Sequence, residues 1–351
     1  MKIILISFST RSAIGDYLFL LVKELMKYEE VFLIVPDYFD KKIEVKGIVK
    51  FKTGKNKCIT FLNLINPLGI LRLITEIKKI NPNLVHLFFG EGYPPMIFIA
   101  LWLKFSKIPL VVTLHDPEIH PGNLIEKING VLRVFTLKLA SAIHIHSRIF
   151  ENRLKKLGVQ KENIFVIPIG SFAPLFSLYK SQEIKKENNI LFFGRLEKYK
   201  GLEYFIYAGL KIDGFKFIIA GPGNMPKNLL KIIQENSQKF ELINKFLSYE
   251  EIAELFQKSR VCVLPYIQAT QSAIPLISAY FEVPVVATKV GAFIEEIPLI
   301  NGVLVEPNNV DSLIKGIFNA LNKKPVYPSG REFKDLVFEF LKMYSKVSGK
   351  Y

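Results

Sequence analysis

Short runs of apolar residues alternate with amphipathic segments along the whole chain. Each run has the composition of a buried strand, and the segments between them repeat apolar residues at helical spacing. Apolar strands that alternate with helices are typical of parallel sheets covered on both faces. The pattern predicts strands at Lys2–Ser7, Glu30–Pro36, Leu84–Phe89, Leu110–Leu114, Ala142–His146, Val166–Ile169, Ile190–Phe193, Phe215–Ala220, Glu241–Ile243, Val261–Leu264, Val285–Ala287 and Gly302–Val305.

This scheme occurs twice, which predicts two Rossmann-like domains. The first set of strands ends near Gly170, and from there to Glu187 the chain loses its periodicity and turns polar. We therefore expect one domain over residues 1–170 and a second over residues 171–332. A chain of 351 residues is long enough to bury two such cores.

The stretch Ile190–Gly201 places two cations near the end of a predicted strand. Gly194 ends the strand, Arg195 follows it, and Lys200 comes just before a segment with helical spacing. In open α/β sheets, ligands bind at the carboxyl ends of strands, where a helix amino terminus also favours an anion. These donors are best suited to a phosphate, and the alternative is a solvated basic loop.

A second glycine-rich loop follows the strand Phe215–Ala220. It contains Gly221, Pro222 and Gly223. This arrangement lets the backbone pass close to a flat or charged ligand, or it simply forms a turn.

The loop after Val261–Leu264 contains small hydrogen-bonding side chains, among them Gln268 and Thr270. Gln271 and Ser272 lie just before a helix-like run, where they suit a second anion or hydroxyl site. Helix capping alone would also explain Ser272.

In the first half, His115 and Asp116 come directly after an apolar strand, with His120 close behind. A histidine–aspartate pair at a strand end can bind hydroxyls or transfer protons, and the alternative is a capped turn. No third ligand at metal-binding spacing is evident, so the sequence predicts no metal site.

Two other features of the first half are weaker signals, a glycine in the first loop and histidines within the strands. Gly15 lies between the first strand and a helical pattern that starts at Tyr17, where it could let the backbone approach a ligand. His86, His144 and His146 lie inside apolar strands, and we interpret them as packing residues.

The chain is basic, with a formal net charge of +15. A basic surface could face nucleic acid, an acidic polymer or anionic lipid. No nucleic-acid-binding module is visible and the lysines are scattered, so we expect no nucleic-acid partner. Cys58 and Cys262 lie far apart without a partner motif, which fits a reducing compartment. No cleavable signal precedes the first strand, and no apolar run is long enough to span a bilayer.

Taken in order, the motifs of the second half resemble the donor half of the family-four retaining glycosyltransferases. They are FFGRLEKYKGL, IAGPGN, FLSYEEIAELFQKSRVCVLPY, ATQS, PVVATKVGAFIEEI and NGVLVEPNN, joined in the first half by VVTLHDPEIHPG, ASAIHIHS and VIPIG. The resemblance is weakest at Lys41–Lys79. It implies the GT-B architecture, α/β with two Rossmann-like domains facing a cleft. It also implies a C-terminal helix, for which Phe333–Tyr344 is the candidate, so that residues 333–351 pack back on the first domain.

The resemblance implies that the second domain binds a nucleotide-sugar donor and the first an acceptor. It assigns the diphosphate to the two cations, the transferred sugar to the histidine at the strand end, and the nucleotide base to the second glycine loop. The implied residues are Arg195, Lys200 and His115 as catalytic groups, and Gly15, Gly194, Gly221, Pro222, Gly223, Gln271, Ser272 and Glu295 as donor-binding groups. No Asp-x-Asp motif occurs, so cations rather than a metal are expected to stabilise the leaving diphosphate, and no cofactor is expected.

The chain departs from the family pattern at several positions. A pair of glutamates found in many members is replaced by Ala269 and Ile277, and two expected glycines are Glu282 and Ala292. A catalytically impaired nucleotide-sugar-binding protein and a nucleotide-sugar epimerase are therefore alternatives.

The leading hypothesis is a cytoplasmic, metal-independent retaining glycosyltransferase. It would move a sugar from a UDP- or GDP-linked donor to a glycan or lipid-linked saccharide in the biosynthesis of a surface polysaccharide such as lipopolysaccharide or capsule. Peripheral contact with the inner face of the membrane, through Phe61–Lys79 or Leu124–Leu139, would suit such an acceptor. For either segment, an amphipathic helix that covers a sheet is the simpler reading.

Overall fold

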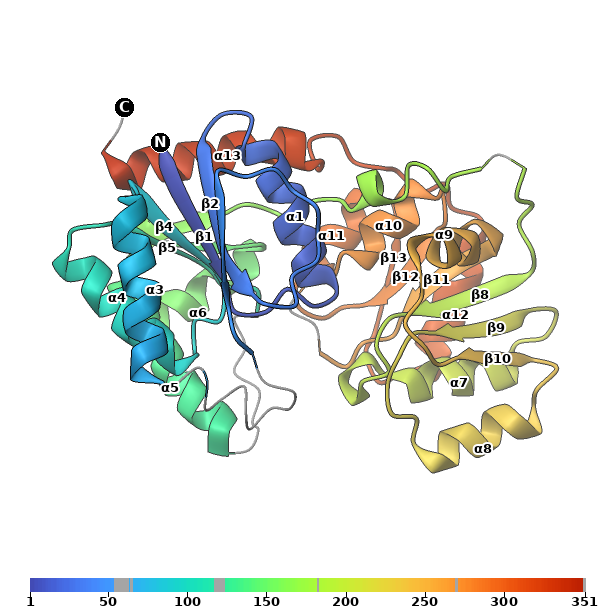
Figure 1. Ribbon diagram of the computed structural model, residues 1–351. Helices are drawn as coiled ribbons and strands as arrows, with labels where there is room; N and C mark the ends of the chain where they lie inside the picture. The colour runs from blue at the N-terminus through green and yellow to red at the C-terminus, as the bar shows by residue number, and fades with distance from the viewer. Residues whose placement is uncertain (54–62, 64–65, 117–123, 182, 269–270, 350–351) are drawn as a thin grey trace. The chain divides into compact units, whose positions relative to one another are not determined.

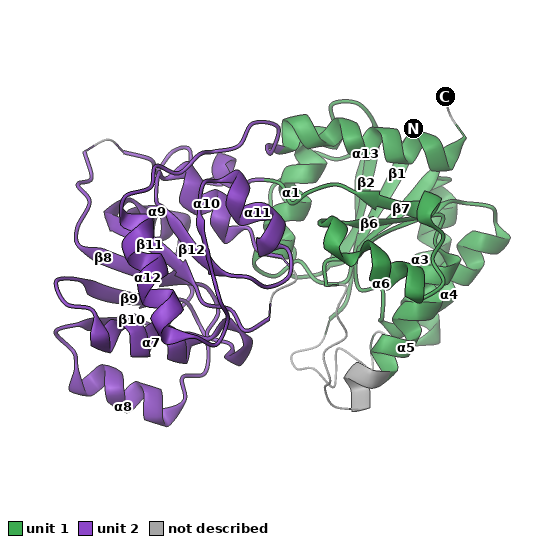
Figure 2. Cartoon of the chain, turned by 180° about the vertical axis from the view of Figure 1, so that it is seen from behind, with its two compact units in different colours: residues 1–170, 333–351 green, residues 171–332 purple. Residues whose placement is uncertain are grey.

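The computed structural model describes residues 1–53, 63, 66–116, 124–181, 183–268 and 271–349. The chain forms two compact units, residues 1–170 with 333–351 and residues 171–332 (Figure 2). Each unit is built on one all-parallel sheet with helices on both faces (Figure 1). The prediction of two Rossmann-like domains with parallel sheets is confirmed.

Unit 1 contains a seven-stranded sheet in the order β3-β2-β1-β4-β5-β6-β7. Its strands are nearly all apolar and buried, which is why the alternation in the sequence predicts them. Its elements are β1 (Lys2–Ser7), α1 (Ala13–Leu25), β2 (Glu30–Pro36), β3 (Gly47–Phe51), α3 (Pro67–Ile80), β4 (Leu84–Phe89), α4 (Pro94–Phe105), β5 (Leu110–Thr113), α5 (Leu124–Leu139), β6 (Ala142–Ile145), η1 (Arg148–Phe150), α6 (Glu151–Lys156), η2 (Lys161–Asn163), β7 (Ile164–Val166) and α13 (Phe333–Ser348).

The C-terminal helix α13 belongs to unit 1, where it packs against α1. The Phe333 and Tyr17 rings meet edge to face with their centroids 4.8 Å apart. Farther along the helix, Phe340 and Tyr344 are fully buried beside the histidines of the sheet. On another side of the unit, α4 packs against both α3 and α5 (Figure 1).

Unit 2 contains a six-stranded sheet in the order β10-β9-β8-β11-β12-β13. One large apolar core lies between this sheet and the helices α7 and α12. The elements are η3 (Ala173–Leu175), β8 (Asn189–Phe193), η4 (Lys198–Lys200), α7 (Leu202–Lys211), β9 (Lys216–Ala220), α8 (Lys227–Glu235), β10 (Phe240–Ile243), α9 (Tyr249–Lys258), β11 (Ser259–Leu264), α10 (Ile274–Tyr280), β12 (Val285–Thr288), α11 (Phe293–Leu299), β13 (Val303–Val305) and α12 (Val310–Leu321).

Three features of unit 1 differ from the sequence prediction. The edge strand β3 was not expected. Its residues alternate between half-buried and exposed, so it lacks the continuous apolar run of the other strands. The last strand is Ile164–Val166, not Val166–Ile169, since its register follows β6 from Ile143 to Ile145. Helix α1 begins at Ala13 rather than Tyr17, so its first turn includes Gly15.

Candidate functional site

In unit 2, the best candidate site lies where the strand order reverses, between β8 and β11. The loop Gly194–Gly201 follows β8, and the loop that begins at Pro265 follows β11. Parallel strands bring both loops to the same edge of the sheet. Such a reversal leaves a crevice at the carboxyl ends of the two strands, which is the usual ligand position in open α/β sheets.

Lys200 brings a buried positive charge to this edge. Its side chain is only 8% exposed, and Nζ donates a hydrogen bond of 2.9 Å to Tyr266 Oη. The ammonium also lies 4.8 Å from the centroid of the Tyr266 ring, in cation–π contact. No carboxylate within the described part of the chain lies at ion-pair distance from Lys200. A buried cation whose protein partner is a neutral phenol is well placed to bind an anion.

The surroundings of Lys200 make its ammonium easier to deprotonate. Burial first, and then the nearby Arg195 guanidinium, lower the pKa of Lys200 to about 8. Arg195 itself is largely exposed and lies 3.4 Å from a carboxylate oxygen of Glu197. The structure therefore brings the two predicted cations close enough to interact, one buried and one facing solvent.

Glycines are required on both sides of the lysine. A Cβ on Gly194 would lie 2.5 Å from Lys200 Nζ, so any larger residue would push the ammonium away from the end of β8. Gly201 has a φ of 65°, and a Cβ there would lie 2.0 Å from the Pro265 carbonyl oxygen. This glycine joins the turn that contains Lys200 to the start of α7.

The loop Gly221–Gly223 is packed against the loop after β8. A Cβ on Gly221 would lie 2.2 Å from the Gly194 carbonyl oxygen, and Leu196 N donates to the Pro222 oxygen at 2.8 Å. The backbone of Gly223 exchanges two hydrogen bonds of 3.0 Å with the Asn244 side chain. The close backbone approach that these glycines allow is thus to the neighbouring loop, and their contact with a nucleotide stays a prediction.

The loop after β11 continues the hydrogen-bond chain from Lys200. Tyr266 is hydrogen-bonded to the Ser272 side chain, and Ser272 Oγ accepts from Ile274 N at 3.3 Å. Ser272 thus accepts from the first residue of α10, although Ala273 rather than Ser272 is the N-cap residue of this helix, and it also holds the phenol that contacts Lys200. Gln271 is half-buried beside it, whereas Thr270 lies outside the described residues. Tyr266 was not singled out from the sequence, although it lies only two residues beyond the end of β11.

At the start of α11 the structure buries Glu296, which the sequence analysis did not single out, next to the predicted donor-binding residue Glu295. Glu295 is exposed, and its neighbour Glu296 is 7% exposed, with neither carboxylate oxygen hydrogen-bonded. Burial raises the pKa of Glu296 to about 8, opposed by Arg331. The helix turn between adjacent residues decides which glutamate faces inward.

We expect Glu296→Gln to stabilise the protein more at pH 8 than at pH 4. The folded chain holds a proton on Glu296 that the unfolded chain loses above its ordinary pKa of 4.5, so stability falls as pH rises from about 4.5 to 8. Glutamine removes this loss, on the order of 2–4 kcal/mol at pH 8. Thermal unfolding at both pH values measures the difference. Glu295→Gln is the exposed control, and an equal gain at both pH values for Glu296→Gln would contradict the assignment.

In unit 1, His115 lies two residues beyond the end of β5 and is 8% exposed. It packs against the rings of Phe88 and Tyr17. Burial lowers the pKa of His115 to about 3, so the ring is neutral at physiological pH. The backbone of Asp116 accepts a hydrogen bond of 2.9 Å from Arg133 Nη1, whereas His120 lies outside the described residues.

Gly15 packs closely against the loop that precedes α1. A Cβ on Gly15 would lie 2.1 Å from the Thr10 carbonyl oxygen. The glycine therefore makes room for the loop that precedes its own helix, because α1 starts earlier than predicted and folds against that loop. Contact of this loop with a ligand stays a prediction.

The strand histidines His86, His144 and His146 are buried and hydrogen-bonded, as expected of packing residues. One of them does more, since His146 Nε2 lies 3.2 Å from His115 Nδ1. Local spacing in the sequence held no signal for this contact, because the two histidines meet only through the pairing of β5 with β6.

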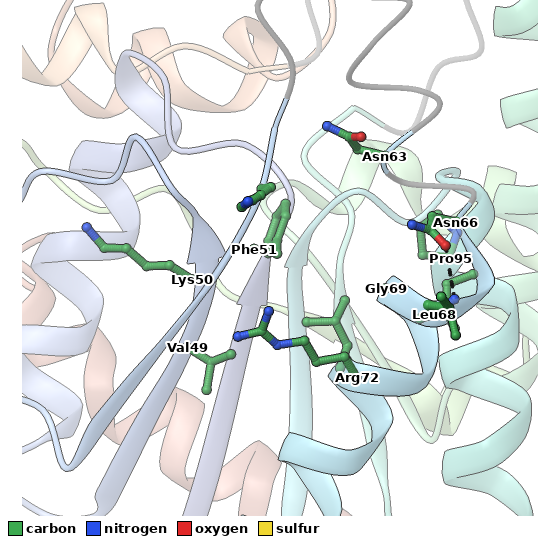
Figure 3. Close-up of a pocket in the computed structure, with 12 residues that line it drawn as sticks. Val49, Lys50, Phe51, Asn63, Asn66, Leu68, Gly69, Arg72 and Pro95 are labelled. Atoms are coloured by element: carbon green, nitrogen blue, oxygen red, sulfur yellow. Dashed lines mark hydrogen bonds between the residues drawn. The ribbon is translucent and has the colours of Figure 1, made fainter.

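A basic pocket of about 290 Å³ opens in unit 1 between β3 and α3 (Figure 3). Lys50, Lys52 and Arg72 line it together with apolar side chains, and none of its lining residues is acidic. In Figure 3 the Arg72 side chain extends from α3 toward Val49 and Phe51 of β3. The pocket is therefore electropositive, and it was not anticipated because β3 was not predicted.

Over the residues that the structure describes, no group of three histidine, cysteine or carboxylate side chains is arranged to hold a metal ion. Within the same residues, no helix has the length and apolarity needed to cross a bilayer.

Two family models match the chain. Residues 187–323 match the model described as glycosyl transferases group 1, and residues 14–170 match the model described as glycosyltransferase family 4. Together they cover most of both units.

Among curated proteins, the chain is 31% identical over 247 residues to an uncharacterised glycosyltransferase of Methanocaldococcus jannaschii. This match covers 64% of the chain and 63% of that protein, which is less than two thirds of its length. The chain is also 26% identical over 186 residues to an α-1,4-N-acetyl-D-galactosaminyltransferase of Campylobacter jejuni, named for an undecaprenol-diphosphate-linked acceptor, with 50% of the chain and 48% of that protein covered.

Solved structures share the fold over the whole chain. The Anabaena protein HepE, crystallised with UDP and glucose, has a TM-score of 0.68 at 15% identity and covers 99% of this chain and 95% of its own. The UDP-GlcNAc 2-epimerase of Methanocaldococcus jannaschii has a TM-score of 0.65 at 15% identity, with 99% and 100% covered. At this identity the likeness shows the fold, in which glycosyltransferases and epimerases both occur.

Proposed function

Since the chain belongs to the group 1 glycosyltransferases, we propose that it transfers a sugar from a nucleoside diphosphate donor to a glycan or lipid-linked acceptor. We propose further that the transfer proceeds with retention at the anomeric carbon and without a metal. The observation that carries the proposal is the buried ammonium of Lys200, which has no carboxylate partner in the described chain and lies at the carboxyl edge of a doubly wound sheet.

The chemistry needs positive charge at the leaving group. The bond between the anomeric carbon and the diphosphate oxygen breaks, and its electron pair leaves with the nucleoside diphosphate. The acceptor hydroxyl oxygen bonds to the same carbon, and its proton passes to the departing phosphate oxygen. Lys200 and Arg195 would stabilise the charge that develops there, and a fixed cation in a site of low polarity is worth more than one in water.

Some of the other predicted donor-binding groups lie near Lys200 in unit 2. Gly194 lies against Lys200, Ser272 holds Tyr266, and Gln271 lies beside Ser272. We propose that these groups bind the diphosphate and sugar, that Gly221, Pro222 and Gly223 face the base, and that Glu295 faces the sugar. His115 would contact the transferred sugar, with the loop that precedes Gly15 near the acceptor.

We expect Lys200→Ala to lower kcat/KM for the donor by about 10²–10³-fold, because it removes a charge that acts on the leaving group. The measurement is release of nucleoside diphosphate from a panel of UDP-, GDP- and ADP-sugars. Lys198→Ala is the matched control, since Lys198 lies in the same turn but is exposed. Replacing Arg195 as well should abolish donor binding. Turnover like that of the wild type in Lys200→Ala would contradict the mechanism.

The rate should also depend on the protonation of Lys200. We expect kcat/KM to fall as pH rises through about 8, because the free enzyme then loses the ammonium. In Lys200→Arg the charge persists at this pH, so the fall near pH 8 should disappear even if the rate is lower. A profile that is flat to pH 10 in the wild type would rule out this lysine as the group that titrates.

For the acceptor, we propose a lipid-linked saccharide presented at the inner face of the cytoplasmic membrane, as in surface polysaccharide biosynthesis. The solvent-facing sides of α3, α4 and α5 expose eight large apolar side chains, and α4 packs between the other two helices. These are Leu68, Leu71, Phe98, Leu101, Phe105, Ile128, Val131 and Phe135. An exposed apolar surface of this kind marks an interaction site.

The charges beside this surface favour an anionic membrane as its partner. Lys104, Lys107 and Lys138 lie together at one end of α4 and α5, and α4 carries no acidic residue. The basic pocket between β3 and α3 continues the surface at Leu68, where it could bind a phosphate of the lipid carrier. Basic residues near a membrane each contribute about 1 kcal/mol of attraction to anionic lipid. The Campylobacter relative, whose printed name gives a lipid-linked acceptor, supports the same class.

Replacing Phe98, Leu101 and Phe105 together by serine should weaken binding to phosphatidylglycerol vesicles by at least about tenfold, because the apolar contact is lost. Co-sedimentation with vesicles at two salt concentrations is the measurement. Phe246→Ser, at an exposed phenylalanine of unit 2, is the control and should bind like the wild type. Equal binding of the triple variant, or no binding by the wild type, would remove the membrane proposal while leaving donor chemistry intact.

A nucleotide-sugar-binding protein with impaired catalysis is the second candidate, favoured by the missing glutamate pair. Ile277 occupies one of these positions and is buried in α10, and Ala269 lies outside the described residues. Tight UDP-sugar binding without diphosphate release would identify this case. The epimerase alternative has less support, because both family models and the curated relatives are glycosyltransferases.

A further inference from the structure

Within the described residues, the phenol of Tyr266 is the one group that accepts a hydrogen bond from the Lys200 ammonium. An ammonium carries three N–H donors and no lone pair, so Tyr266 Oη must be the acceptor of this bond of 2.9 Å. The ring of the same tyrosine lies 4.8 Å from Nζ and adds a cation–π contact. In the described part of the chain, two N–H groups of the buried ammonium are therefore left without an acceptor.

The surrounding structure fixes the phenol without help from Lys200. Tyr266 is only 2% exposed, and its ring packs against Phe293 of α11 with the centroids 5.1 Å apart. Its backbone carbonyl accepts a hydrogen bond of 2.6 Å from Thr288 Oγ1 at the end of β12, and its hydroxyl is also hydrogen-bonded to the Ser272 side chain. Lys200, by contrast, carries its charge on a flexible four-carbon stem. The tyrosine is therefore the rigid member of the pair.

We propose that Tyr266 is a positioning residue for the transfer, whose hydroxyl holds the Lys200 ammonium at the carboxyl end of β8 and leaves two N–H groups for the departing diphosphate. The part about the diphosphate rests on the proposed function, whereas the hold on the ammonium does not. Gly194 leaves space for the ammonium there, because even a Cβ at Gly194 would lie 2.5 Å from Nζ. A lysine held in place before the donor arrives loses less side-chain freedom when the donor binds.

The same contact favours the charged form of Lys200. A hydrogen bond from an ionised donor is roughly twice as strong as one between neutral groups, so the phenol stabilises the ammonium more than the amine. Burial, which is the largest effect, and the Arg195 guanidinium lower the pKa of Lys200 to about 8. Glu197 and Cys262 act in the opposite direction on this pKa. Burial raises the pKa of Tyr266 itself, so the phenol keeps its proton while Lys200 titrates.

The test is NMR of the full chain labelled at the lysine Cε carbons, which follows the titration of Lys200 without any donor sugar. Tyr266→Phe keeps the ring and removes only the hydroxyl. It should lower the midpoint of Lys200 by about one pH unit, the value of one hydrogen bond to a charged group. Tyr280→Phe is the matched control and should leave this midpoint unchanged. The Lys180 ammonium lies 4.7 Å from the Tyr280 ring, but it donates to the backbone carbonyl of that tyrosine.

An unchanged Lys200 midpoint in folded Tyr266→Phe would overturn the proposal. A second measurement needs no variant and serves if Tyr266→Phe does not fold. In the wild type labelled at the tyrosine Cζ carbons, the Tyr266 signal should shift with the same midpoint as Lys200, because the phenol then loses its charged partner. A Tyr266 signal that does not follow the Lys200 titration would also overturn the proposal.

Activity tests the remaining part of the proposal, with release of nucleoside diphosphate from UDP-, GDP- and ADP-sugars as the measurement. In Tyr266→Phe, kcat/KM should fall about tenfold below pH 7. Its alkaline decline should also begin about one pH unit earlier than in the wild type, a shift that a purely structural role would not produce. If the NMR midpoint moves as expected but no donor is turned over, the proposed function fails and the hold of Tyr266 on Lys200 stands.

Discussion

The burial of one ammonium group at the edge of a parallel sheet is the constraint around which the loops of unit 2 are built. Lys200 reaches the end of β8 only because Gly194 leaves it space, and Gly201 lets the chain turn back under Pro265 into α7. Removing a charge from water is costly. Within the described chain, the Lys200 ammonium is hydrogen-bonded to the phenol of Tyr266 and has no carboxylate at ion-pair distance. A buried cation of this kind is well placed to receive an anion, which is consistent with the proposed binding of a diphosphate.

Unit 1 handles its buried polar groups in the opposite way. Its core histidines are held by hydrogen bonds to a hydroxyl, a carbonyl or another ring. Burial lowers the pKa of His115 and of His144 so far that neither carries charge at physiological pH. The two units thus differ in their buried polar groups, an ammonium in unit 2 and neutral imidazoles in unit 1.

Topology explains why both sets of residues lie at strand ends. Each sheet reverses its order once, between β1 and β4 in unit 1 and between β8 and β11 in unit 2. Right-handed crossovers then place helices on opposite faces on either side of the reversal, so the loops diverge and leave a crevice. Lys200 and Tyr266 come from the two loops of one reversal, and His115 follows the strand beside β4 in the other. The helices α3, α4 and α5 cover unit 1, and their exposed apolar side chains are free for a further partner.

The sequence by itself determined the two parallel-sheet domains, nearly all of their strands and the helix α13, because a strand buried on both faces must be apolar along its whole length. The sequence also placed the two cations in the loop after β8, and its motifs indicated the family. It failed at β3, whose edge position leaves its residues half exposed, and at the start of α1. Only the tertiary structure decided that Lys200 is buried while Arg195 is exposed, that Glu296 rather than Glu295 faces inward, and that His146 contacts His115. Each of these depends on groups brought together from distant parts of the chain, such as Lys200 and Tyr266, or on the rotation of one helix turn. Local periodicity carries no information about either.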